Sequence, residues 1–128
     1  MIEDTIINYI TLEESESPTL AETMGFEEGT TVPVYAMRPV DAPEYYFMIE
    51  RTGGSESNML HTTTLAVQSY GPTLLEAAKL NKWVIEHMKQ IAKYDDVASS
   101  KYQTDYNFTN TLTKQPRYQA VFSILHYE

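Results

Sequence analysis

Two predicted β-strands in the middle of the chain, followed at once by a helix, constrain the fold more than any other feature. Residues 45–51 alternate with the period of two that is typical of a strand. Gly53-Gly54 then predicts a turn, because glycine tolerates positive φ, and the polar residues 55–60 predict a mobile loop. The β-branched residues of 62–70 predict a second strand, and Gly71-Pro72 marks the start of a helix.

The remaining elements follow from periodicity. A stripe of apolar residues at helical spacing predicts one long helix, with Trp83 at its flank as a core residue. One domain over 1–128 is expected, divided into a helix and acidic loop at 1–30, three strands at 31–70, the long helix at 72–93 and two strands at 96–127. The predicted fold class is α+β: a mixed or antiparallel sheet of about five strands, with an N-terminal helix and the long helix packed on one face.

The last strand, 117–127, is apolar on both of its faces. Tyr118 and Phe122 lie on one face, and Val121 and Leu125 lie on the other. Helices on one side of a sheet bury only that side, so the second face is expected to be covered as well. A neighbouring subunit could cover it, and the ten tyrosines of the chain also favour protein interfaces.

Composition excludes several classes of protein. With 9 basic and 18 acidic residues the net charge is −9, which argues against sustained contact with nucleic-acid phosphates. No apolar run approaches the roughly 20 residues of a membrane helix. The absence of cysteine excludes disulfides and thiolate metal sites. We therefore expect no membrane association and no specific recognition of DNA.

No motif for catalysis or metal binding is present. His61, His87 and His126 are scattered, and none has a partner at the spacing of a known metal motif. His87 is predicted to form an exposed neighbour pair with Glu86, and Glu13-Glu14 to be solvated. There is no cysteine and no nucleophile elbow. The sequence predicts a protein that is not an enzyme and that needs no cofactor.

Two short signatures resemble a known family. Glu50-Arg51 followed by Gly53-Gly54, and then Val67-Gln68-Ser69-Tyr70 before an alanine-containing helix, are similar in order and spacing to tail-terminator and tail-completion proteins of long-tailed bacteriophages. A weaker signature, Pro116-Arg117-Tyr118-Gln119, opens the last strand. The chain departs from the family at Tyr70, where tryptophan is expected, and in its last loop, which lacks a P-D-P motif.

The resemblance implies a structural virion protein, assembled in the host cytoplasm and located in the neck region of the tail. Such a subunit closes into a hexameric ring that caps the head-proximal end of the tail tube, ends its polymerisation and helps to join tail to head. The implied partners are further copies of the chain, the tail tube protein and the head connector protein, while DNA passes through the ring. A head-tail connector or stopper is an alternative, and an acidic soluble adaptor or regulator is an alternative of another class.

The candidate residues for a subunit or partner interface come from these signatures. Arg51 would contact a partner or form a local pair with Glu50 at a strand end. Gln68 would pair across a subunit boundary or lie exposed on the wet side of its strand. The full set is Glu50, Arg51, Gly53, Gly54, Gln68, Tyr70, Arg117, Tyr118 and Phe122.

Overall fold

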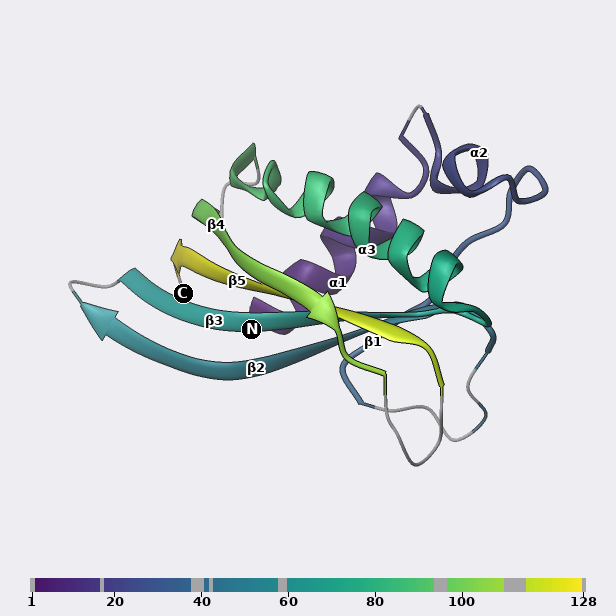
Figure 1. Cartoon of the computed structure of the whole chain (residues 1–128). Helices are drawn as coiled ribbons and strands as arrows, with labels where there is room; N and C mark the ends of the chain where they lie inside the picture. The colour runs from purple at the N-terminus through teal and green to yellow at the C-terminus, as the bar shows by residue number, and fades with distance from the viewer. Residues whose placement is uncertain are drawn as a thin grey trace.

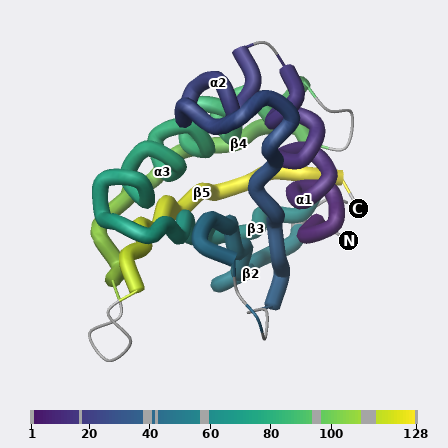
Figure 2. The backbone as a smooth tube through the Cα atoms, turned by 90° about the vertical axis from the view of Figure 1, so that its right-hand side faces the viewer, coloured from purple at the N-terminus to yellow at the C-terminus, as the bar shows by residue number. Residues whose placement is uncertain are grey.

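The protein folds into a single sheet with its helices gathered on one face. The computed structural model describes residues 2–16, 18–37, 41, 43–57, 60–93, 97–109 and 115–127. Helices α1 (Ile2–Glu13) and α3 (Leu74–Met88) lie on the same side of the sheet, and the short helix α2 (Leu20–Met24) lies farther from it (Figures 1 and 2). A 3-10 turn, η1 (Ile91–Lys93), follows α3. Among the described residues, no helix lies on the other face of the sheet (Figure 1).

In the part of the chain that the structure describes, the sheet has five strands in the order β1-β2-β3-β5-β4. They are β1 (Val34–Tyr35), β2 (Tyr46–Ser57), β3 (Leu60–Tyr70), β4 (Val97–Asn107) and β5 (Arg117–Tyr127). The short β1 runs parallel to β2, and every other neighbouring pair is antiparallel. The predicted α+β class, with a mixed sheet, an N-terminal helix and a longer helix, is therefore confirmed.

The core lies between the sheet and the helices. Trp83 of α3 stacks on Phe47 of β2 with ring centroids 5.9 Å apart and is only 5% exposed, which confirms it as a core residue. Ile6 and Ile10 of α1 are fully buried in the same cluster. Because side chains alternate along a strand, the neighbours of Phe47 in β2 point to the open face, away from the helices.

The corner between β3 and α3 depends on a close backbone approach. Thr73 is the N-cap of α3 and accepts a hydrogen bond from the Glu76 N–H at 3.2 Å. A Cβ added to Gly71 would lie 2.8 Å from the backbone nitrogen of Ala77, so only glycine fits here without movement. The helix ends at Met88, earlier than the predicted residue 93. Residues 94–96, between η1 and β4, lie outside the described residues.

The prediction of a turn at Gly53-Gly54 is wrong. Both glycines lie inside β2, paired with Thr64 and Thr63, and the glycines with positive φ are Gly25 and Gly29. The register shifts between Arg51 and Gly53, which marks a β-bulge in place of a turn. The prediction of a loop at 55–60 is also wrong for residues 55–57 and 60. Residues 55–57 continue β2, because β3 pairs with them as far as Leu60. Residues 58 and 59 lie outside the described residues.

The other boundaries agree more closely with the sequence. The first of the three strands predicted at 31–70 is reduced to the two residues of β1, which form an edge. The two strands predicted at 96–127 correspond to β4 and β5. Within the described residues, no helix is long and apolar enough to cross a membrane.

Candidate functional site

The sequence signatures of β3 and β5 face each other on adjacent strands. The ladder pairs Gln68 with Gln119 and Tyr70 with Arg117. Tyr46 of β2, opposite Tyr70 in the next ladder, stacks on the Tyr70 ring with centroids 4.2 Å apart and planes within 8° of parallel. Since Phe47 faces the helices, this stack lies on the open face of the sheet.

A chain of hydrogen bonds crosses this face, and we call its members the open-face network: Gln68, Tyr70, Tyr106, Arg117 and Gln119. The Tyr70 hydroxyl donates to Gln68 Oε1 at 2.7 Å and accepts from Arg117 Nη1 at 2.7 Å. Gln68 Nε2 donates to Gln119 Oε1 at 2.9 Å, and Gln119 Nε2 donates to the Tyr106 hydroxyl at 2.6 Å. Three strands are thus tied together by side chains, which gives this face a fixed shape.

The network ends in a rim of exposed aromatic rings. The Arg117 guanidinium lies 4.4 Å from the Phe108 ring centroid, and its Nε donates to the Phe108 carbonyl at 2.5 Å. Phe108 packs edge-on against Tyr106. Tyr106 is 40% exposed and Phe108 is 38% exposed, so this end of the face offers apolar contact with a polar surround, as protein interfaces do.

Gln68 is not exposed on the wet side of its strand, which was one of the two alternatives. It is 3% exposed, and its amide is satisfied by Gln119 and Tyr70 of the same chain. Phe122 is fully buried in the core, on the helix side of β5, so its side chain is not available to a partner in the folded subunit. Tyr118 is half-buried beside Ser69.

The Glu50-Arg51 and Gly53-Gly54 signature lies farther along β2, away from the open-face network. Glu50 is exposed on the open face, while Arg51 projects to the helix side. A Cβ on Gly54 would lie 2.6 Å from Arg51 Nη2, so Gly54 leaves the space that the guanidinium occupies. The candidate residues therefore form two groups on the sheet, and the glycine pair has a packing role where a turn was predicted.

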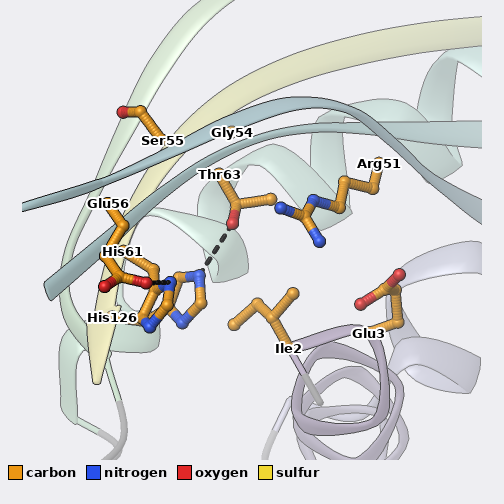
Figure 3. Close-up of a pocket in the computed structure, with 9 residues that line it drawn as sticks. All are labelled: Ile2, Glu3, Arg51, Gly54, Ser55, Glu56, His61, Thr63 and His126. Carbon is orange, nitrogen blue, oxygen red and sulfur yellow. Dashed lines mark hydrogen bonds and ion pairs between the residues drawn. The ribbon is translucent and has the colours of Figure 1, made fainter. Parts of the chain in front are cut away.

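Arg51 reaches into a pocket of about 400 Å³ beside the start of α1, the Arg51 pocket (Figure 3). Stacked imidazoles of His61 and His126, 5.5 Å apart, form one wall, and Thr63 Oγ1 lies 2.7 Å from His126 Nε2. The other lining residues are Ile2, Glu3, Gly54, Ser55 and Glu56. Across the described residues, no group of three His, Asp or Glu is placed to bind a metal ion.

A buried pair of carboxyl groups at the end of α1 was not predicted from the sequence. Glu13 and Glu14 are each 5% exposed, where solvation was predicted. His87 lies 3.0 Å from Glu13 Oε1, so its predicted pairing with Glu86 is also wrong. Lys93 Nζ donates to Glu13 Oε1 at 2.9 Å. These partners lie more than seventy residues away in sequence, and no local pattern could indicate them.

The pKa values of the two carboxyl groups are shifted in opposite directions. Burial raises the pKa of Glu13, but hydrogen bonds from His87, Lys93 and Tyr9 and the charge of Lys93 outweigh it, so the pKa of Glu13 lies below its ordinary value. Among the described contacts the Glu14 carboxyl group accepts only the Val32 N–H, at 2.6 Å, and burial raises the pKa of Glu14 to about 7. Both groups fasten α1 to the rest of the subunit and lie apart from the open-face network.

Comparison with known proteins adds one observation. No family model matches the sequence, and no curated protein matches it either. Solved structures do match, among them a chain from the virion of a native gene transfer agent (GTA) particle, at a TM-score of 0.57 and 12% sequence identity. The match covers 94% of this chain and 93% of that one. The two chains share a fold.

Proposed function

We propose that this chain is a structural protein of a phage-like virion, which closes into a ring, caps the head-proximal end of the tail tube and ends its polymerisation. The single observation that carries this proposal is the shared fold with a chain of the GTA virion over nearly the full length of both chains. The order and spacing of the two signatures support the finer role, because they resemble those of tail-terminator proteins.

The geometry of the sheet suits such a role. The open-face network ties β3, β5 and β4 together through side-chain hydrogen bonds, and it ends in the exposed rings of Tyr106 and Phe108. A rigid face with aromatic anchors favours binding to a protein partner, since little conformational entropy is lost on contact. The partners of this proposal are copies of the chain itself, as a hexamer, together with the tail tube protein and the head connector protein.

The charge of the subunit is consistent with a ring that DNA passes through. A net charge of −9 on each copy repels phosphate, so the genome would slide without specific contacts. A structural role of this kind involves no chemical reaction and therefore needs no catalytic group. In this proposal the protein is located in the neck of the virion.

Deletion of the gene in a phage that carries it tests the proposal. The expected result is full heads together with tails that are overlong or unable to join, seen by electron microscopy. Complementation with the wild-type chain should restore normal particles. Tails of normal length with heads that lose their DNA would indicate a stopper instead, and normal particles with a defect in lysis or replication would refute a virion role.

The size of the assembled protein distinguishes a soluble adaptor from these virion roles. Light scattering over a range of concentrations, with and without tail tube protein, should show a ring of the purified chain in at least one condition. A chain that remains a monomer or dimer in all of them would favour the adaptor.

A further inference from the structure

We propose that strand β4 of a second copy adds to the free edge of β2 and that its side chains fill the Arg51 pocket. This inference rests on the proposed ring, for which it specifies the subunit contact. It combines three features of the described residues: two unpaired sheet edges of opposite direction, a matching pair of bulges, and complementary charges on the two edges.

The first feature is the outer edge of β2. The strand β1 pairs only with Phe47 and Met48, so beyond Ile49 the edge of β2 has no partner among the described residues. Phe47 donates its N–H outward to the Pro33 carbonyl at 2.9 Å, which sets the alternation along the strand. With the bulge after Arg51, the residues that point N–H and C=O outward are Arg51, Gly54 and Glu56. An unpaired edge of this kind is a template for another strand.

The opposite edge of the sheet is β4. Phe108 donates its N–H inward to the Arg117 carbonyl at 2.9 Å, so by alternation Asp105, Tyr102 and Ser100 point their backbone groups outward. Three antiparallel pairings separate β2 from β4, so the two edge strands run in opposite directions. When β4 of one copy meets β2 of the next in a continued sheet, the pair is again antiparallel. Such a head-to-tail contact generates a ring when the rotation between neighbouring copies closes, as the proposed function requires.

The bulges narrow the choice of register to two. In β2 the extra residue lies between Arg51 and Gly53, and in β4 extra residues lie between Tyr102 and Thr104 and between Val97 and Ser99. With Arg51 opposite Asp105 of the second copy, the first two of these bulges face each other, and Gly54 then lies opposite Tyr102. Shifting the strands by two residues places each bulge against a regular strand. The second bulge of β4 would face that of β2 with Arg51 opposite Ser100, which offers no charge to the guanidinium, so charge decides between the two registers.

The charges agree with this register. Among the described residues Arg51 has no ion-pair partner, and Asp105 would meet it on the helix side of the joined sheet. Asn81 Nδ2 donates to Asp105 Oδ2 at 2.9 Å, which holds the carboxylate in place at the edge. Lys89 Nζ lies 5.2 Å from the Tyr102 ring centroid, so Lys89 of the second copy would lie close to Glu3 in this register. The Oε1 atom of Glu3 is buried without a hydrogen-bond partner.

The absence of cysteine from the chain allows a direct test by disulfide cross-linking. In the proposed register Ser55 lies opposite Lys101 of the second copy, on the open face and as a non-hydrogen-bonded pair. The Cα atoms of such a pair are about 4.5 Å apart, which suits a disulfide. Both residues are exposed in the single subunit. Within one chain they lie on opposite edges, about 14 Å apart across three strand spacings, so any disulfide must join two copies.

The variant with Ser55→Cys and Lys101→Cys should give a ladder of covalent oligomers on a non-reducing gel after mild oxidation of the assembled protein. The matched control combines Ser55→Cys with Ser99→Cys, whose exposed side chain lies two residues along the same face. That diagonal distance is about 7–8 Å, beyond the reach of a disulfide. The expected yield of the ladder is at least about tenfold lower for the control.

Each outcome decides a different point. Rings seen by light scattering without a 55–101 ladder, or with an equal ladder in the control, overturn the proposed contact and leave the virion role standing. A chain that never assembles, alone or with tail tube protein, overturns the ring of the proposed function and this contact with it. A ladder confined to the 55–101 pair establishes the register.

Discussion

Substitution of Glu14 by glutamine is expected to stabilise the protein at neutral and alkaline pH. The carboxyl group is 5% exposed, and its Oε1 accepts the Val32 N–H at 2.6 Å. No cation contacts it among the described residues, so no opposite charge offsets the burial of the charged form. An amide oxygen in Glu14→Gln accepts the same hydrogen bond and carries no charge.

The magnitude follows from the pKa. Burial raises the pKa of Glu14 from 4.5 to about 7, and each pKa unit corresponds to about 1.4 kcal/mol. The folded state therefore holds this proton more tightly than the unfolded state does, so stability falls as pH rises from 4.5 to about 7 and is constant above it. At pH 8 the cost is about 3 kcal/mol, of which glutamine should recover about 1–3 kcal/mol, because its amide N–H groups need partners of their own.

Urea unfolding at pH 4.5 and pH 8 measures the effect. Glu14→Gln should match the wild type at pH 4.5 and exceed it at pH 8. The neighbouring Glu13→Gln is the matched control with the opposite sign: its pKa is lowered, so its contribution is present above pH 4.5 and lost below. That variant should be destabilised at pH 8, since Lys93 and His87 lose their carboxylate. An equal effect of Glu14→Gln at both pH values would refute the reasoning.

Two further predictions concern single contacts. Gly71→Ala should lower the free energy of unfolding by about 1–3 kcal/mol, because the new Cβ would lie 2.8 Å from Ala77 N. The control Gly53→Ala, whose Cβ would have no atom nearer than 3.9 Å, should change the free energy of unfolding by less than about 0.5 kcal/mol. Equal effects of the two substitutions in urea unfolding would contradict the packing argument. Gln68→Ala should cost about 1–3 kcal/mol, because Gln119 Oε1 loses its donor, and unchanged thermal stability would show that the open-face network contributes little.

The elements of this fold could be read from the sequence because they depend on local periodicity. The alternation of 45–51 and of 117–127, and the stripe of the long helix, each place apolar side chains on one face at the period of the element. The turn predicted at Gly53-Gly54 failed for a related reason. Glycine permits a turn without requiring one, and partners in β3 continue the ladder past it.

The candidate site was only partly predictable. The signatures containing Gln68, Tyr70 and Arg117 were found in the sequence, but the pairing that joins them spans some fifty residues and exists only once β3 lies beside β5. The same holds for Glu13 and His87, which looked solvated in isolation. By itself the sequence determined which segments are helix and strand, since period and turn chemistry are local. Only the tertiary structure decided which polar side chains are buried and which residues they contact, because burial and hydrogen-bond partners depend on how the elements pack.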